Sequence, residues 1–279
     1  MESTALTHVG TYRRRVRAAA ARIWENVLDW EHLPWLHRTT FRDVRLLEAR
    51  RDGWRVSTGL QSAGAGARIG IETRLEQSKS RYLTLTTDGP GQGTEIWTQL
   101  ERAAEGATDI EVRFLVPAVP PERVASIGDA YVRLYTRLWD EDEGMMMRRT
   151  EMLARRPASP VTARAATTLD LGDVESVRSR LPLLLELDGR RYRLVDVGGE
   201  LVAHGTTCPH LLGPLEEAII ADGCLRCPWH GYRFDVRTGR GIERPDLQLD
   251  VPRVQIDPRT LRVTITAAPL AGSPGWCET

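Results

Sequence analysis

The sequence predicts an α+β fold, in which an antiparallel sheet packed against a long helix precedes a smaller all-β domain. Three observations lead to this prediction. Segments of alternating polar and apolar residues recur between positions 44 and 116, an apolar stripe at helical spacing follows to about position 155, and short alternating segments return after position 167. Alternation predicts half-buried strands, and the stripe predicts an amphipathic helix.

The first domain, residues 1–154, begins with an expected strand, a short helix near 18–28 and a turn that Pro34 interrupts. Six strands are expected next, because period-2 segments alternate with breaks at Gly, Asp and Pro. They lie at 44–48, 53–59, 68–75, 82–87, 95–100 and 109–116. A long helix opens at 120–122 and would pack on the sheet through one apolar face. This face consists of Val124, Ile127, Tyr131, Leu134, Tyr135, Leu138 and Met145.

The second domain, residues 167–279, follows a segment without periodic apolar residues. This segment, 155–166, is rich in Pro, Ala, Ser and Arg, and we interpret it as a linker. The strands expected after it are all short. They lie at 183–187, 191–197, 200–203, 224–226, 251–256 and 262–265.

Composition limits the partners and the compartment that we expect. Lys and Arg balance Asp and Glu at 38 each, which argues against nucleic acid or an anionic membrane surface. No apolar run is long enough for a membrane span, and the polar, then basic, N-terminus shows no secretory signal. Four cysteines, two of them in metal-like spacing, favour a reducing compartment over a disulfide framework. A cytoplasmic protein with a metal site is the expectation.

Two short motifs supply two Cys-His pairs. Cys208-Pro209-His210 is followed by Cys227-Pro228-Trp229-His230-Gly231. Two thiolates on one iron and two imidazoles on the other are the ligands of a Rieske-type [2Fe–2S] cluster. The prolines, together with Gly213, Pro214 and Gly231, suit tight, rigid turns. A zinc site with cysteine and histidine ligands is the alternative.

These motifs resemble the Rieske domain family, and residues 227–240 (CPWHGYRFDVRTGR) are close to its oxygenase-type members. The resemblance implies that Cys208, His210, Cys227 and His230 hold the cluster. Rieske proteins of cytochrome complexes have an extra cysteine in each motif, and usually a serine after the glycine of the second motif. Here these places hold Leu212 or its neighbours, Trp229 and Tyr232. The loss of these groups predicts a low-potential cluster.

The first domain resembles a second family of known architecture. Its order of strand, short helices, sheet and long helix resembles the helix-grip fold. Residues 16–48 also look like the opening of the START/polyketide-cyclase (SRPBCC) superfamily, a resemblance that covers roughly 9–153. It implies a deep, largely apolar cavity between sheet and helix.

A possible second iron site is encoded by Asn26-x-x-Asp29-x-x-His32-x-x-x-x-His37. This motif resembles the mononuclear iron motif of Rieske non-haem iron oxygenases, in which the two histidines and a helix carboxylate bind Fe(II). Here the long helix carries the run 140–143, from which the resemblance favours Asp142, although such a run is otherwise typical of a solvated face. Asp29, grouped with Asn26 as catalytic, would couple the iron to a cluster histidine of a neighbouring subunit. The order of the two domains is the reverse of that in known members.

The favoured hypothesis is a Rieske oxygenase component that hydroxylates or demethylates a small organic substrate with O₂. No dinucleotide-binding fingerprint is present, so a separate NAD(P)H-dependent reductase, with or without a ferredoxin, is expected. The resemblance also implies a homo-oligomer such as a trimer.

Two alternatives stay open. The chain is either a Rieske electron carrier fused to a non-catalytic ligand-binding domain, or a cyclase-like enzyme with acid–base residues in its cavity. The positions of His32 and His37 discriminate between the oxygenase and the electron carrier. Histidines directed into the cavity towards Asp142 favour the oxygenase, and histidines facing solvent favour the carrier.

Overall fold

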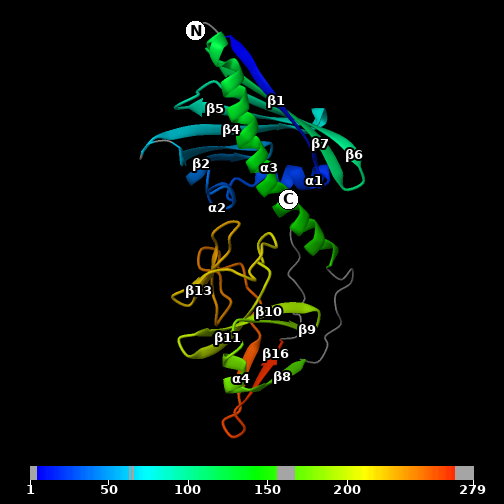
Figure 1. Ribbon diagram of the computed structural model, residues 1–279, viewed down its shortest axis with the longest axis vertical. Coiled ribbons are helices and arrows are strands. Elements are labelled where there is room, and N and C mark those ends of the chain that lie inside the picture. Colours follow the sequence, from blue (N-terminus) through cyan, green and yellow to red (C-terminus); the bar gives the residue numbers. More distant parts are fainter. Residues whose placement is uncertain (1–4, 63, 65, 156–166, 268–279) are drawn as a thin grey trace. The chain divides into compact units, whose positions relative to one another are not determined.

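The computed structural model describes residues 5–62, 64, 66–155 and 167–267. The chain forms two compact units, which divide between Glu151 and Met152 (Figure 1). We call them unit 1 and unit 2 and describe each by itself. Apart from Arg155, the predicted linker lies outside the described residues.

Unit 1 is built on a single antiparallel sheet of seven strands in the order β1-β7-β6-β5-β4-β3-β2. Each strand from β2 to β6 pairs with the next one along the chain, and β1 pairs with β7. All six strands predicted from the alternation are present, and the expected first strand forms an edge of the sheet. The strands are β1 (Leu6–Val16), β2 (Phe41–Arg50), β3 (Gly53–Leu60), β4 (Arg68–Glu76), β5 (Arg81–Asp88), β6 (Glu95–Ala104) and β7 (Ala107–Pro117).

Three helices accompany this sheet. Helices α1 (Ala20–Leu28) and α2 (Leu33–Leu36) connect β1 to β2, and α3 (Val124–Ala154) follows β7 and runs across one face of the sheet (Figure 1). The predicted break at Pro34 is a single helical turn, because proline fits the first turn of a helix, where its missing N–H costs no hydrogen bond.

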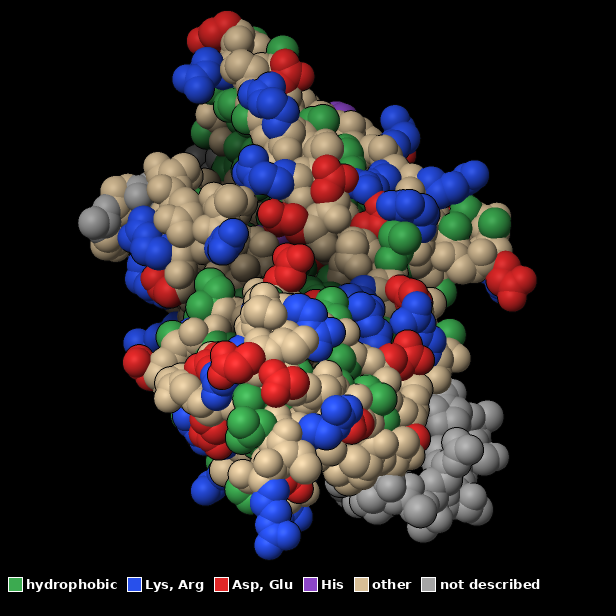
Figure 2. Space-filling view, turned by 60° about the horizontal axis from the view of Figure 1, so that its bottom comes forward, with side chains coloured by type: hydrophobic (Ala, Val, Ile, Leu, Met, Phe, Trp, Pro, Cys, Tyr) green, Lys and Arg blue, Asp and Glu red, His purple; other side chains and the backbone are tan. Residues whose placement is uncertain are grey.

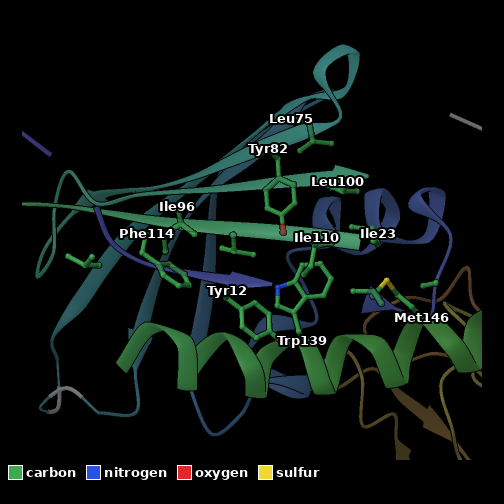
Figure 3. Packing of buried hydrophobic residues seen from close by; sticks show 14 residues of the cluster. Tyr12, Ile23, Leu75, Tyr82, Ile96, Leu100, Ile110, Phe114, Trp139 and Met146 are labelled. Carbon is green, nitrogen blue, oxygen red and sulfur yellow. The ribbon is translucent and has the colours of Figure 1, made fainter. Parts of the chain in front are cut away.

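The core of unit 1 lies between the sheet and α3, where large side chains from both meet (Figure 3). Phe114 of β7 stacks on Tyr131 of α3 with ring centres 5.0 Å apart. Trp139 and Met146 of α3 are almost fully buried, although neither belongs to the predicted apolar stripe. The buried face of the helix is therefore wider than the stripe indicates.

Two glycines set the closest approach of α3 to the sheet. A Cβ atom added at Gly128 of α3 would lie 2.1 Å from the carbonyl oxygen of Val9 on β1. A Cβ atom at Gly10 would lie 3.3 Å from the Cα of Gly128. Only glycine at position 128 permits this contact without movement of the backbone.

Unit 2 contains three small antiparallel sheets, ordered β11-β10-β9, β12-β13-β14 and β15-β16-β8. The predicted short strands are present, and the sequence patterns missed β8, β12, β14 and the helix α4. Asp173 caps α4 by accepting hydrogen bonds from the amides of Glu175 and Ser176. The elements are β8 (Thr168–Asp173), α4 (Val174–Arg178), β9 (Leu183–Leu187), β10 (Arg190–Val197), β11 (Glu200–Gly205), β12 (Ile220–Ala221), β13 (Cys224–Arg226), β14 (Arg233–Asp235), β15 (Arg253–Ile256) and β16 (Arg262–Thr266).

Acidic and basic side chains are interspersed on the face drawn in Figure 2, as the balanced composition leads one to expect. Among the described residues, no helix is both long and apolar enough to cross a membrane.

Candidate metal centres

The two Cys-His motifs of unit 2 form loops of the same backbone geometry. In the first, the amide of Cys208 donates to the carbonyl oxygen of Gly213 over 2.9 Å. In the second, the amide of Cys227 donates to the carbonyl oxygen of Tyr232 over 2.9 Å. Each loop thus closes on the residue five positions after its cysteine, and the closure holds cysteine and histidine of one motif on the same turn.

A left-handed residue completes each loop. Gly231 has a φ of +70° and donates its amide to the carbonyl oxygen of Cys227, and Leu212 has a φ of +65° and does the same for Cys208. Glycine adopts this conformation at no cost, whereas a leucine is strained in it. Of the predicted turn residues, Gly231 takes the left-handed position in the second loop, and in the first loop Leu212 takes it, next to Gly213.

Gly213 has a different role, which is to leave space. A Cβ atom at this position would lie 3.0 Å from the sulfur of Cys227 and 3.2 Å from the ring of Trp229. The absence of a side chain lets the two loops approach each other beside this sulfur.

The four predicted cluster ligands come together in this arrangement. Cys208 and Cys227 are fully buried, and His230 is almost so. The rings of His210 and His230 lie 4.6 Å apart, centre to centre, and nearly perpendicular. One side of the site thus offers two sulfurs and the other offers two imidazoles.

A hydrogen bond joins the two cysteine side chains. A hydrogen bond to Cys227, with burial, raises the pKa of the Cys208 thiol, and the same hydrogen bond lowers the pKa of Cys227 to about 5. His230 and backbone amides near Cys227 contribute to its lower pKa. A buried cysteine with a lowered pKa suits a metal cluster, which binds cysteine as the thiolate. The donor set fits the predicted [2Fe–2S] cluster.

In unit 1, the structure brings His32, His37 and Asp142 together. One ligand atom from each lies within 4.8 Å of the other two. The Oδ1 atom of Asp142 is 3.1 Å from Nε2 of His37 and 3.6 Å from Nε2 of His32. Donors about 2.1 Å from one ion lie about 3 Å apart when they subtend a right angle, so these spacings fit a single bound metal. The choice of Asp142 from the acidic run agrees with this geometry.

A carboxylate lies behind each histidine, and the one behind His37 is within hydrogen-bond distance of its ring. Nδ1 of His37 lies 2.6 Å from Oε2 of Glu141, and Nδ1 of His32 lies 3.5 Å from Oδ2 of Asp29. A carboxylate that accepts the Nδ1 proton leaves the Nε2 lone pair free for a metal. Sequence reasoning missed Glu141, whose position in the acidic run one residue before Asp142 was the available signal.

The predicted catalytic pair, Asn26 and Asp29, occupies two places in the site. The amide nitrogen of Asn26 donates to Oδ1 of Asp142 over 3.0 Å, so this residue fixes the carboxylate. Asp29 stands beside His32, and its other oxygen accepts the amide of Glu31. Its predicted coupling to a neighbouring subunit stays a prediction.

The acidic run of α3 divides between two roles. Glu141 and Asp142 belong to the histidine site, whereas Asp140 and Glu143 pair with Arg14 of β1. Arg17 also pairs with Glu143, which is buried. These ion pairs tie α3 to the end of β1 and hold the helix turn that presents Asp142.

Neighbouring charged groups together outweigh burial in setting the pKa values of His37 and Asp142. Burial opposes ionisation of His37, but Asp142 and Glu141 outweigh it and raise the pKa of His37 to about 9. Burial also opposes ionisation of Asp142, but His37, His32 and the hydrogen bond from Asn26 lower the pKa of this carboxyl. Without a metal, the site therefore holds a buried imidazolium–carboxylate pair, and a divalent cation would take the place of the proton.

The three donors open into a cavity of about 120 Å³ between the sheet and α3. Its walls are mostly apolar and aromatic. They comprise Val27, Leu33, Phe41, Trp54, Ile71, Thr73, Tyr82, Thr84, Tyr135, Leu138 and Trp139. The cavity is smaller than the deep pocket that the sequence predicts, because aromatic rings of α3 and the sheet fill the space between them (Figure 3).

Comparison with known proteins bears mainly on the family of unit 2. The model of the Rieske [2Fe-2S] domain family matches residues 167–254. Apoptosis-inducing factor 3 of Mus musculus is 34% identical over 110 residues, which are 39% of this chain and 18% of that protein. The chain thus spans less than a fifth of the length of this relative.

Two further proteins are similar to one unit each. The ferredoxin component of the 2,4-dinitrotoluene dioxygenase system of a Burkholderia species is 30% identical over 83 residues, which are 28% of this chain and 79% of the ferredoxin. The Zhui aromatase/cyclase of Streptomyces sp. R1128 matches 56% of this chain and 99% of its own, with 16% identity and a TM-score of 0.43. The family match, the ferredoxin relative and the paired loops agree: through residues 167–254, the chain belongs to the Rieske [2Fe-2S] domain family.

Proposed function

We propose that the chain is the oxygenase component of a Rieske non-haem iron system, acting on a small organic substrate with O₂. The observation that carries the proposal is the convergence of His32, His37 and Asp142 on the buried cavity of unit 1. This is the arrangement that the sequence hypothesis requires of an oxygenase, in a chain that also contains a Rieske domain.

The residues of unit 1 have distinct tasks in this proposal. Fe(II) held by two histidines and one carboxylate keeps coordination positions open for O₂ and substrate. Glu141 keeps the imidazole of His37 in the metal-binding tautomer, Asp29 lies beside His32, and Asn26 orients Asp142. The apolar walls of the cavity exclude water and hold an apolar part of the substrate next to these donors.

Electrons would reach the iron through the Rieske cluster, which carries one electron at a time. We propose that Asp29 connects His32 to a cluster histidine of a neighbouring subunit, which requires a homo-oligomer such as a trimer. A separate NAD(P)H-dependent reductase would reduce the cluster. Light scattering of the cluster-loaded chain tests the oligomer, and a monomer at working concentration would rule out transfer between subunits.

The decisive experiment counts iron and acid-labile sulfide per chain after anaerobic reconstitution with Fe(II). We expect three irons and two sulfides in the wild type, and two of each in the variant His32→Ala/His37→Ala. His8→Ala is the matched control, because His8 is an exposed histidine of unit 1 that hydrogen-bonds to Thr11. Its iron content should equal that of the wild type.

The second candidate function is a Rieske electron carrier fused to a ligand-binding unit. It is favoured by the ferredoxin component that resembles unit 2 along most of its length. Two irons and two sulfides in both the wild type and the double variant would support this function and would exclude the oxygenase.

A further inference from the structure

Tyr232 covers the cluster site of unit 2 from one side. Its ring stacks on His230 at an interplanar angle of 19° and meets the ring of His210 edge-on, 4.9 Å away. Its carbonyl oxygen accepts the amide of Cys227, and only 9% of the residue is exposed. Tyr232 is therefore fixed to the second loop through its backbone and to both cluster histidines through its ring.

An arginine holds the outer edge of this ring. The guanidinium carbon of Arg244 lies 5.9 Å from the ring centre of Tyr232, and its side chain hydrogen-bonds to this tyrosine. Arg244 is itself held by two hydrogen bonds to Asp246, of 2.9 and 2.7 Å. Paired hydrogen bonds between guanidinium and carboxylate fix the orientation of an arginine as well as its position.

The turn that carries Arg244 is closely packed. The amide of Leu247 donates to the carbonyl oxygen of Arg244, and a Cβ atom at Gly241 would lie 2.2 Å from that oxygen. Glu243 anchors the turn to β14 through the amide and the guanidinium of Arg233. Arg244 thus stands at a built position, with its positive charge beside the aromatic cover of the cluster site.

We propose that Arg244 is a positioning residue of the Rieske cluster, which holds Tyr232 against His210 and His230 and raises the reduction potential through its charge. Reduction adds one negative charge to the cluster, and a nearby cation stabilises that charge. Asp246 orients Arg244 and partly offsets its charge. This inference requires only the cluster, and it stands whether or not unit 1 binds iron.

The test is a redox titration of the full, cluster-loaded chain, followed by the electron paramagnetic resonance signal of the reduced cluster. Arg244→Gln should shift the reduction equilibrium towards the oxidised form by roughly three- to tenfold, where tenfold corresponds to 59 mV for one electron. The control is Arg262→Gln on β16, which removes an arginine of similar exposure that pairs with Asp170. This control changes the net charge equally and should leave the potential at the wild-type value.

Two more variants separate charge from position. Asp246→Asn keeps the charge of Arg244 and removes a negative one, so the potential should rise; it also carries the test if Arg244→Gln fails to retain the cluster. Arg244→Lys keeps the charge but not the paired hydrogen bonds. It should stay near the wild-type potential with an altered visible circular dichroism spectrum. Equal potentials for Arg244→Gln and Arg262→Gln, or an unchanged potential in Asp246→Asn, would overturn the proposal.

Discussion

At the scale of single residues, the sequence identifies the metal-binding side chains more readily than the groups that orient them. Cysteine and histidine are uncommon in this chain, so their spacing in the two motifs of unit 2 is informative by itself. Glu141 was not predicted, because glutamate is common on helix surfaces and its contact with His37 depends on packing between α3 and α2. Leu212 was missed for a related reason, since its left-handed backbone is imposed by the loop and not by its own preference.

Replacement of Glu141 by Gln should weaken metal binding in unit 1. Glutamine cannot supply the charge that makes the imidazole of His37 a stronger donor, and loss of such a partner costs roughly 10- to 100-fold in metal affinity. Anaerobic calorimetric titration with Fe(II) measures this loss. Asp140→Asn is the control, because it removes the same charge one residue earlier, from a side chain that pairs with Arg14 instead. Equal losses in both variants would contradict the role of Glu141.

Glu72 of β4 should give unit 1 a pH-dependent stability. This buried carboxylate pairs with Arg74 and Arg50, and these arginines lower its pKa. A carboxyl whose pKa is lower in the folded state stabilises the fold above its unfolded pKa, and this contribution is lost as the pH falls through the folded value.

The variant Glu72→Gln should therefore be less stable than the wild type at neutral pH, by about 1 kcal/mol given the partly exposed arginines. The difference should shrink below the unfolded pKa of 4.5. Urea unfolding at pH 7 and at successively lower pH measures it, with Glu101→Gln at an exposed position as the control. If the stability difference between Glu72→Gln and the wild type grew on acidification, the predicted role of Glu72 would be wrong.

At the scale of elements, alternation and helical spacing predict long segments well and short ones poorly. All six predicted strands of unit 1 and the long helix follow from their patterns, because each has one face on buried core side chains. Strands β12 and β14 have two and three residues, too few for a period to be read. Strand β14 begins directly after the second cluster loop, and β12 pairs with β13, which leads into that loop.

Two glycines of α3 should respond to alanine in opposite directions. Alanine at Gly128 would bring a Cβ atom to 2.1 Å from the carbonyl oxygen of Val9, whereas nothing lies within 4 Å of a Cβ atom at Gly144. Gly144→Ala should stabilise unit 1 by about 0.5–1 kcal/mol through helix propensity. Gly128→Ala should destabilise it by roughly 1–3 kcal/mol despite the same gain in propensity, because the helix must move. Denaturant unfolding followed by far-ultraviolet circular dichroism compares the two, and a stabilised Gly128→Ala would show that the helix is not held by this contact.

At the scale of the whole molecule, the sequence predicts two domains, but their separate cores become evident only in the structure. The core of unit 1 joins β1, the strands β4 to β7 and α3, and the core of unit 2 joins α4 with β9, β10, β11 and β16. Residues far apart in the chain form each core, and local patterns do not encode such pairings. The iron site depends on the same long-range packing, since Asp142 is more than one hundred residues from His37.

Because each unit has its own core, Fe(II) should stabilise one unit and not the other. A ligand that binds only the folded state stabilises it by about 2.7 kcal/mol at one hundred times its Kd. For a unit of this size, the gain corresponds to a rise on the order of 5–10 °C in the unfolding temperature. Anaerobic scanning calorimetry of the cluster-loaded chain should show the unit 1 transition rising with Fe(II) while the unit 2 transition stays in place. In His37→Ala, the unit 1 transition should no longer respond, because one of the three donors is lost. If Fe(II) raises both transitions equally, or raises the unit 1 transition in His37→Ala as well, the metal acts elsewhere than at His32, His37 and Asp142.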